Sequence, residues 1–122
     1  MLSVRVQRGE DGCICGFVVR GHAGFAVRGQ DIVCAAVSAL TQTAVLALQQ
    51  RLGVGAAVTM GAGSLTCRIP ASMDEMLAVR VQDTLETMCL GLREIEAIYP
   101  TRVTLADPAG GIRRRDIDDG AP

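Results

Sequence analysis

The stretch from Asp31 to Gly53 reads DIVCAAVSALTQTAVLALQQRLG and decides the fold. Its apolar residues recur every three or four positions, which places their side chains on one face of an α-helix. That stripe comprises Val33, Val37, Leu40, Ala44, Leu48 and Leu52. Asp31 is a favourable N-cap and Gly53 a favourable stop, so a helix of about 33 Å is predicted over 31–52. Because its first half is apolar nearly all round, we expect that end to be deeply packed.

On the N-terminal side of this helix the sequence predicts a β-hairpin. Apolar and polar residues alternate from Leu2 to Gln7, which is typical of a half-buried strand, and Asp11-Gly12 favours a tight turn. The return strand covers 13–20. Strict alternation along it gives one face made of Cys13, Cys15, Phe17 and Val19 and another made of Ile14, Gly16 and Val18. Residues 21–30 have neither period and are rich in glycine, so they are expected to form a loop.

On the C-terminal side a second hairpin is predicted from 56–60 and 64–69. A capping-box pattern at Ser72 and Glu75 then begins a second helix that runs to about Ile98, and 101–105 forms a last strand. The order ββαββαβ predicts an α/β (α+β) fold, a single domain in which a mixed sheet packs against two long helices. The domain is expected to cover 1–106, with 107–122 as a flexible C-terminal tail.

Composition excludes several classes of protein. The chain has 122 residues, 12 basic residues that are all Arg, 13 acidic residues and a net charge of −1, so it lacks the overall basic charge of a nucleic-acid-binding domain. Aromatic residues make up 2%, too few for a base-stacking surface. No uninterrupted apolar run approaches the roughly 20 residues of a membrane span. We therefore expect no direct nucleic-acid partner and no membrane partner.

The cysteines point to a reducing compartment. Five cysteines cannot all pair internally, and the alternating start of the chain does not resemble a secretory leader. A cytoplasmic protein with reduced thiols is expected. Four of the five cysteines are expected to be buried packing residues rather than half of a zinc site, namely Cys13, Cys15, Cys67 and Cys89.

The residues that could carry chemistry surround the start of the first helix. If Asp31 is the N-cap, Cys34 is the third helical residue, where free backbone N–H groups and the helix dipole favour a thiolate. His22, the only histidine, lies in the loop before this helix. A cysteine–histidine pair of this kind supports nucleophilic catalysis on acyl groups. A cysteine near a helix start is also commonly a packing residue, and a histidine beside glycines commonly a loop hydrogen-bonding residue.

The residues themselves carry a resemblance. Gly21-His22-Ala23-Gly24-Phe25, followed by GQDIVCAAVSAL over 29–40, resembles the signature of the ribosomal-processing cysteine proteases called Prp. The resemblance is dense over residues 20–45 and extends more loosely, in length and element order, over 1–106. It implies a small cytoplasmic hydrolase, a thiol protease of ribosome biogenesis, that is usually a homodimer. It further implies that the enzyme removes the short N-terminal extension of a large-subunit ribosomal protein.

The same resemblance assigns roles at the site. His22 and Cys34 fall on the catalytic pair, and Gly21, Gly24 and Gly29 on the hinges of a mobile loop, with simple turn chemistry as the alternative. The thiolate attacks the scissile carbonyl, backbone N–H groups including that of Cys34 hold the oxyanion, and His22 protonates the leaving amine. Asp31 either only caps the helix or also orients His22 or contacts substrate. Ser38 either bonds the carbonyl of Cys34 one turn back or contacts the floor of the site.

No cofactor and no metal are expected. Two other functions remain open on the sequence. One is a non-catalytic, ribosome-associated module that uses the glycine-rich loop to grip a peptide. The other is a metal-binding protein in which His22 and Cys34 act with another thiol.

Overall fold

The computed structural model describes residues 1–21 and 31–110. Its elements are β1 (Leu2–Arg8), β2 (Ile14–Arg20), α1 (Ile32–Leu46), η1 (Ala47–Arg51), β3 (Ala57–Gly61), β4 (Ser64–Arg68), α2 (Glu75–Ile98) and β5 (Val103–Ala106). The strands form one sheet in the order β3-β4-β2-β1-β5, in which β1 and β5 are parallel and the other neighbours antiparallel. The predicted mixed sheet and two long helices are therefore confirmed.

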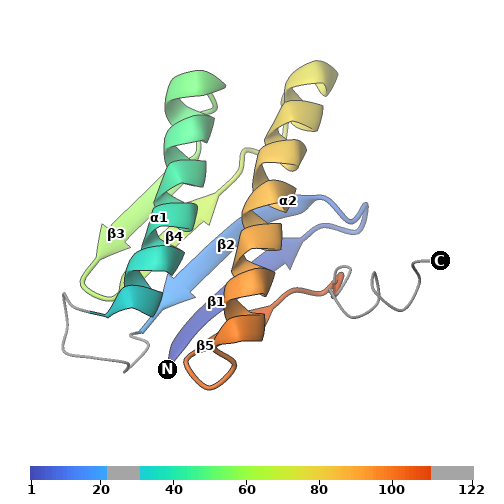
Figure 1. Cartoon of the computed structure of the whole chain (residues 1–122). Helices are drawn as coiled ribbons and strands as arrows, with labels where there is room; N and C mark the ends of the chain where they lie inside the picture. The colour runs from blue at the N-terminus through green and yellow to red at the C-terminus, as the bar shows by residue number, and fades with distance from the viewer. Residues whose placement is uncertain (22–30, 111–122) are drawn as a thin grey trace.

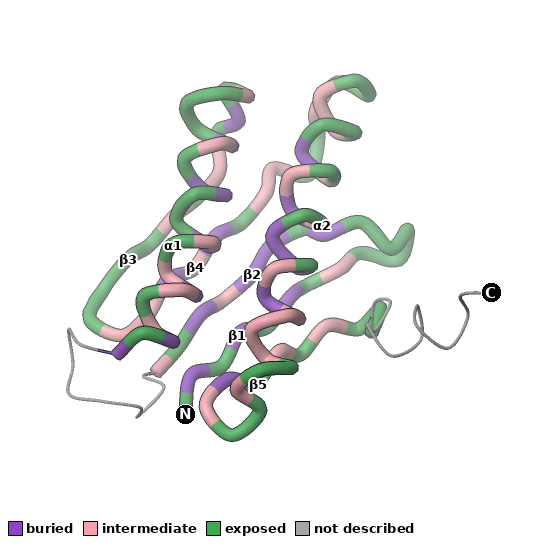
Figure 2. The backbone as a smooth tube through the Cα atoms, in the orientation of Figure 1, coloured by how far each residue is buried: buried purple, intermediate pink, exposed green. Residues whose placement is uncertain are grey.

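The molecule has two layers, because α1 and α2 lie side by side on the same face of the sheet (Figure 1). Buried and exposed positions alternate along β1 (Figure 2), and the buried Leu2, Val4 and Val6 belong to the same core cluster as residues of both helices. The fully buried large side chains of the core include Phe17, Ile14, Leu48, Leu85 and Leu92. The other face of the sheet is not covered by a helix of the described chain.

A β-bulge corrects the predicted pattern of β2. Gln7 pairs with Gly16 but Arg8 pairs with Ile14, so Cys15 is an extra residue opposite β1. The extra residue shifts the alternation and brings Ile14, which is 1% exposed, into the core with Phe17. Cys13 and Cys15 are both exposed, so the prediction that they are buried is wrong. Gln82 of α2 holds this end of β2, since its side-chain amide bonds the N–H of Ile14 at 2.8 Å and its carbonyl at 2.9 Å.

The first helix follows the predicted range but differs at both ends. Its last turn is the π-helix η1, in which Leu52 N–H donates to Ala47 O, and Gly53 ends it with a φ of 66°. Its start is less deeply packed than expected, because Ile32 is 56% exposed while Val33 is 1% exposed. Ile32–Arg51 is long and apolar enough, by length and composition, to cross a membrane. In this fold its inner face supplies much of the core, which accounts for that apolar composition.

The second helix begins at a different cap from the one predicted. Asp74, rather than Ser72, is the N-cap, and its Oδ1 accepts from the N–H of Met76 at 2.8 Å and of Leu77 at 3.4 Å. Aspartate and serine are similarly good caps, so the pattern alone does not separate them. The inner face of α2 contributes Val81, Leu85, Met88 and Leu92 to the core.

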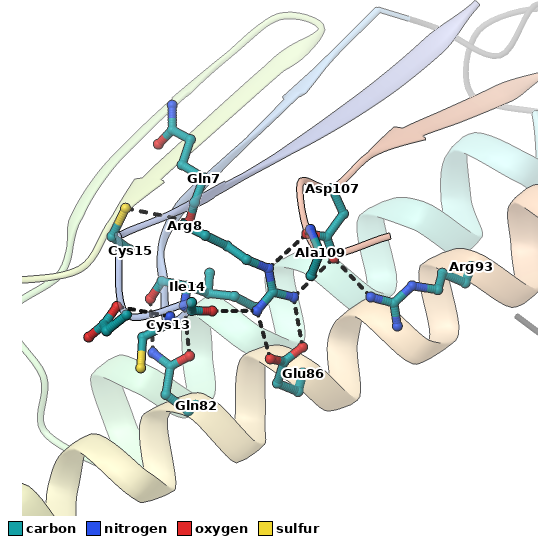
Figure 3. A network of polar contacts seen from close by, with 12 residues as sticks. Gln7, Arg8, Cys13, Ile14, Cys15, Gln82, Glu86, Arg93, Asp107 and Ala109 are labelled. Carbon is teal, nitrogen blue, oxygen red and sulfur yellow. Dashed lines mark hydrogen bonds and ion pairs between the residues drawn. The ribbon is translucent and has the colours of Figure 1, made fainter. Parts of the chain in front are cut away.

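An ion-pair network joins the end of β1 and the residue after β5 to the middle and second half of α2 (Figure 3). Arg8 holds Glu86 through two bonds of 2.8 and 3.0 Å, Asp107 through two of the same lengths, and the carbonyl of Gly12 at 2.8 Å. Arg93 donates to the same Asp107 carboxylate at 2.8 Å. The Asp107 side chain is only 3% exposed, so the packed part of the chain continues beyond 106 into the segment expected to be a tail. Residues 111–122 lie outside the described residues.

Candidate active site

Cys34 is the third residue of α1, and Asp31 caps that helix. Asp31 has an extended backbone, with φ −75° and ψ 108°, and its Oδ1 accepts from the N–H groups of Val33 and Cys34 at 3.0 Å each. Its side chain can reach those donors because an N-cap residue leaves the helical conformation just before the first turn. Asp31 is 6% exposed and Cys34 is partly exposed. The capping that the sequence predicts is therefore present, and it fixes Cys34 in the first turn.

The same cap bears on the expected oxyanion site, which stays a prediction. The N–H of Cys34 is the donor that the sequence predicts for the oxyanion, but it already donates to Asp31 Oδ1 at 3.0 Å. A backbone N–H has one hydrogen, so the carboxylate and an oxyanion compete for it. Oxyanion binding by the Cys34 N–H therefore requires Asp31 to share or give up that bond.

The backbone of Gly21, the residue before the predicted catalytic His22, is held in one conformation. Its φ is 91°, and a Cβ built on it would lie 2.5 Å from the carbonyl oxygen of Met1. Its N–H donates to Gly63 O at 2.9 Å, in the turn between β3 and β4. Both the backbone conformation and the close approach require glycine. Gly21 therefore sets the direction in which the chain leaves β2, immediately before His22.

Gly21→Ala is expected to destabilise the protein by about 1–3 kcal/mol, because alanine is strained at this φ and meets the Met1 carbonyl. Urea unfolding followed by circular dichroism measures the change. Gly55→Ala is the matched control, since a Cβ at Gly55 has nothing within 4 Å. A Gly21→Ala midpoint equal to that of Gly55→Ala would contradict this account of Gly21.

Several predicted site residues lie outside the described residues. These are His22, Gly24 and Gly29, so the approach of His22 to Cys34 stays a prediction. Ser38 is described and lies one turn after Cys34, partly buried. A hydroxyl bond to the carbonyl one turn back, of the kind considered for Ser38, is seen in this helix at Thr41, whose hydroxyl donates to Val37 O at 2.9 Å. The role of Ser38 at the site also stays a prediction.

The other cysteines differ from Cys34 in their surroundings. Cys67 and Cys89 are buried as predicted, and burial raises the pKa of each thiol to about 11. The pKa of Cys13 is raised by desolvation and by the nearby Asp11 carboxylate. The Cys15 thiol lies 3.4 Å from the carbonyl of Gln7. Only Cys34 combines partial exposure with the N-terminal turn of a long helix.

Cys34 is expected to react with iodoacetamide before the other four thiols at mildly acidic pH. Cys67 and Cys89 stay protonated and shielded there, and Cys13 lies next to a carboxylate. Peptide mapping after a short exposure gives the order of labelling, with the urea-unfolded protein as the reference for equal access. Equal, slow labelling of all five cysteines in the folded protein would count against an activated Cys34.

A metal centre has no support in the described part of the chain. Among residues 1–21 and 31–110, no group of three His, Cys, Asp or Glu side chains is placed to hold a metal ion. The metal hypothesis from the sequence includes His22, which is not among these residues. What the described residues do present is a capped, partly exposed thiol at a helix start, which is the arrangement of a cysteine nucleophile.

Comparisons with known proteins agree with this arrangement. The family model for the cysteine protease Prp matches residues 1–104, a range that includes both His22 and Cys34. The ribosomal processing cysteine protease Prp of Bacillus subtilis is 34% identical over 101 residues, which cover 81% of this chain and 90% of that protein. The fold is similar to that of Staphylococcus aureus Prp with a covalently linked product peptide, at a TM-score of 0.78 and 25% identity over 87% of this chain and 98% of that one. The same S. aureus protease with a substrate peptide gives a TM-score of 0.72 at 24% identity over 86% and 97% of the two chains.

Proposed function

This chain belongs to the Prp family of cysteine proteases, and we propose that it cuts the N-terminal extension from a large-subunit ribosomal protein. The observation that carries the proposal is Cys34, held by the Asp31 cap as the third residue of α1 within the matched range. Two structures of the S. aureus relative, one with a substrate peptide and one with a covalently linked product peptide, support a peptide partner. A cytoplasmic location is part of the proposal.

In the proposed reaction the Cys34 thiolate attacks the carbonyl carbon of the scissile peptide bond. A C–S bond forms, and the carbonyl electrons move to oxygen to give a tetrahedral oxyanion. When the oxyanion collapses, the C–N bond breaks and His22 gives its proton to the departing amine. The shortened ribosomal protein leaves with its new amino terminus, and the extension stays bound to sulfur as an acyl-enzyme.

Water then completes the cycle. Neutral His22 takes a proton from water, and the resulting hydroxide attacks the thioester carbonyl. The C–S bond breaks, the extension leaves with a carboxylate end, and the thiolate and protonated His22 are restored. Oxyanion donors are worth roughly 3–4 kcal/mol each in a closed site. Because Asp31 occupies the N–H of Cys34, this role falls to donors elsewhere or requires the cap to loosen.

A cleavage assay on a defined peptide tests the proposal. The peptide carries the N-terminal extension and first mature residues of the organism's own ribosomal protein, and a peptide of the same composition in scrambled order is the control. One cut at one position, seen by mass spectrometry only with the native order, is expected. Binding of the native peptide without cleavage would favour the non-catalytic module instead. If the native peptide is neither cut nor bound, the proposed ribosomal substrate is wrong, while the assignment to the family still stands.

We further propose that two copies associate through the helical layer. Ile32 is 56% exposed and Leu46 is 49% exposed on α1, although both are large and apolar. A groove between α1 and α2 is lined mostly by small side chains, among them Ala39, Thr43 and Ala47. Small residues let a second helix approach closely, and the apolar residues exposed elsewhere on α1 gain from being covered. A second copy of the chain is the occupant that the family resemblance implies.

Ala39→Glu is expected to raise the dissociation constant of this dimer on the order of 100-fold, because it places a carboxylate in the groove that already holds Asp83. Sedimentation velocity over a range of protein concentrations measures the change. Ala71→Glu, in an exposed segment before α2, introduces the same charge outside the groove and should leave association unchanged. A wild-type protein that stays monomeric at high concentration would contradict the dimer and leave the protease assignment intact.

A further inference from the structure

The face of the sheet opposite the helices gathers positive charge. Side chains alternate along a strand, so the neighbours of the buried residues of β1, β2 and β4 point to this open face. The strand register places Arg5, Arg20 and Arg68 there: Arg5 pairs with Val18, Arg20 with Ser3 and Ser64, and Arg68 with Gly16. No strand residue that shares this face is Asp or Glu. A chain of net charge −1 thus presents one surface that is purely basic.

These charges are uncompensated within the described chain. All three arginines are exposed, and none of their side chains forms an ion pair or hydrogen bond with another described residue. A network of ion pairs joins Arg8 and Arg93 to Glu86 and Asp107 at one end of the sheet, and it includes none of these three arginines. The open face therefore keeps its guanidinium donors available to a partner.

The spacing of the arginines suits an extended anion rather than a single one. Neighbouring strands lie about 4.8 Å apart, and two residues advance about 6.7 Å along a strand. Arg20 pairs with Ser3, two residues from Arg5 on the adjacent strand, so the Cα atoms of Arg5 and Arg20 are about 8 Å apart. Arg20 pairs with Ser64, four residues from Arg68 on the next strand, so the Cα atoms of Arg20 and Arg68 are about 14 Å apart. Arg5 and Arg68 are two strands apart across the sheet and two residues apart along it, about 12 Å, so the three Cα atoms form a triangle. Each guanidinium can therefore meet a different charge of an extended polyanion.

The other side chains of this face indicate which polyanion fits. They are small or hydroxyl-bearing, such as Ser3, Ser64 and Thr66, and no aromatic residue is among them. Protein interfaces centre on aromatic and apolar anchors, which this face lacks apart from the partly buried Val18. Nucleic-acid interfaces are polar and positive, with Arg forks and hydroxyl groups bonded to phosphate oxygens. A second copy is disfavoured, since arginines would face arginines.

We propose that this open sheet face docks the phosphate backbone of a nucleic acid, without preference for base sequence. The net charge of −1 gives no reason to expect a nucleic-acid partner, because acidic residues of the helical layer offset the arginines of the open face in the sum. Binding here leaves Cys34 accessible, since α1 lies in the opposite layer. The proposal is independent of the protease reaction, although an RNA-bound enzyme would be held near a ribosomal substrate.

Two charge-matched double variants test the proposal. R5Q/R68Q removes two positive charges from the open face, and R51Q/R80Q removes two exposed arginines from the helices. Binding of a fluorescent oligouridylate is followed by anisotropy at about 50 mM and about 200 mM salt. We expect R5Q/R68Q to bind roughly tenfold more weakly and to lower the salt slope by about 0.7 for each phosphate that is no longer neutralised. R51Q/R80Q should bind within about twofold of wild type.

The remaining outcomes are equally decisive. Equal weakening by both double variants would mean diffuse attraction and overturn the assigned face, as would no binding by the wild type at low salt. Polyglutamate binding that depends on Arg5 and Arg68, in the absence of oligouridylate binding, would overturn the proposal in favour of an acidic protein partner. An oligothymidylate arm distinguishes RNA from DNA as the source of the phosphates. Unchanged peptide cleavage by R5Q/R68Q, with an unchanged unfolding midpoint, would show that the variant is folded and that docking is separate from catalysis.

Discussion

Replacing Cys34 by alanine is expected to abolish cleavage of the ribosomal peptide while the protein stays folded. The sulfur is the atom that forms the bond to substrate, so its removal eliminates the acyl-enzyme route rather than slowing one step of it. Loss of a nucleophile lowers the rate by about 10⁴-fold or more. Cys34 is only partly buried, and alanine keeps the Asp31 cap, which bonds backbone N–H groups rather than the thiol. The rate of product formation by mass spectrometry, beside the unfolding midpoint, gives the two readouts.

Cys15→Ala is the matched control, because Cys15 is an exposed thiol at the bulge of β2 and should be dispensable. Peptide binding by the Cys34→Ala variant, measured by anisotropy, is expected to persist, since the side chain removed is small. This separates recognition from bond cleavage. Full-rate cleavage by Cys34→Ala would show that another group is the nucleophile and would remove the mechanism proposed for this site.

Asp107→Ala is expected to destabilise the protein by about 3 kcal/mol, the largest loss we expect from one surface-adjacent side chain. The Asp107 carboxylate bonds Arg8 at 2.8 and 3.0 Å and Arg93 at 2.8 Å, and these arginine side chains are only 7% and 16% exposed. Removing it leaves two partly desolvated cations without their shared partner. Arg8 keeps Glu86 and the carbonyl of Gly12, which limits the loss. Urea unfolding measures the effect, and Glu10→Ala, at an exposed turn, should change stability by less than about 0.5 kcal/mol.

The Asp107 carboxylate also makes the free energy of unfolding depend on pH in the acidic range. Hydrogen bonds from Arg8 and its positive charge lower the pKa of Asp107 to about 2, against 3.8 for an unperturbed group. A pKa depressed in the folded state contributes stability above the unfolded value, and that contribution is lost as pH falls from about 4 toward 2. Wild type should therefore lose about 2 kcal/mol more than Asp107→Ala over this window. Parallel acid curves for the two proteins would show that Asp107 is not the group responsible.

Local sequence patterns are sufficient for most of the architecture. The period of the stretch after Asp31, the alternation from Leu2 and the stripe of α2 each predict an element, because apolar side chains must share one face to reach a core. The Asp31 cap and the position of Cys34 in the first helical turn also follow from local chemistry, since an N-cap acts within three residues of itself. The competing cap at Asp74 shows the limit of this reasoning where two good caps stand close together.

Local patterns fail wherever a distant partner matters. The bulge at Cys15 arises from the pairing of β2 with β1, and nothing in β2 alone reveals it, so alternation places Cys13 and Cys15 in the core although both are exposed. The burial of Asp107 depends on Arg8, which lies 99 positions away in the chain. Likewise, the N-cap pattern at Asp31 does not by itself show which N–H groups remain for an oxyanion.

The sequence by itself determined the order of the elements, the capped helix start that presents Cys34, and the motif that carries the family resemblance. These depend on residues within a turn or two of one another. Only the tertiary structure decided the strand order, the two-sided sheet, the network around Arg8 and the collection of Arg5, Arg20 and Arg68 on one face. Their partners are distant in the chain and are brought together by backbone pairing across the sheet, whose register a single sequence does not specify.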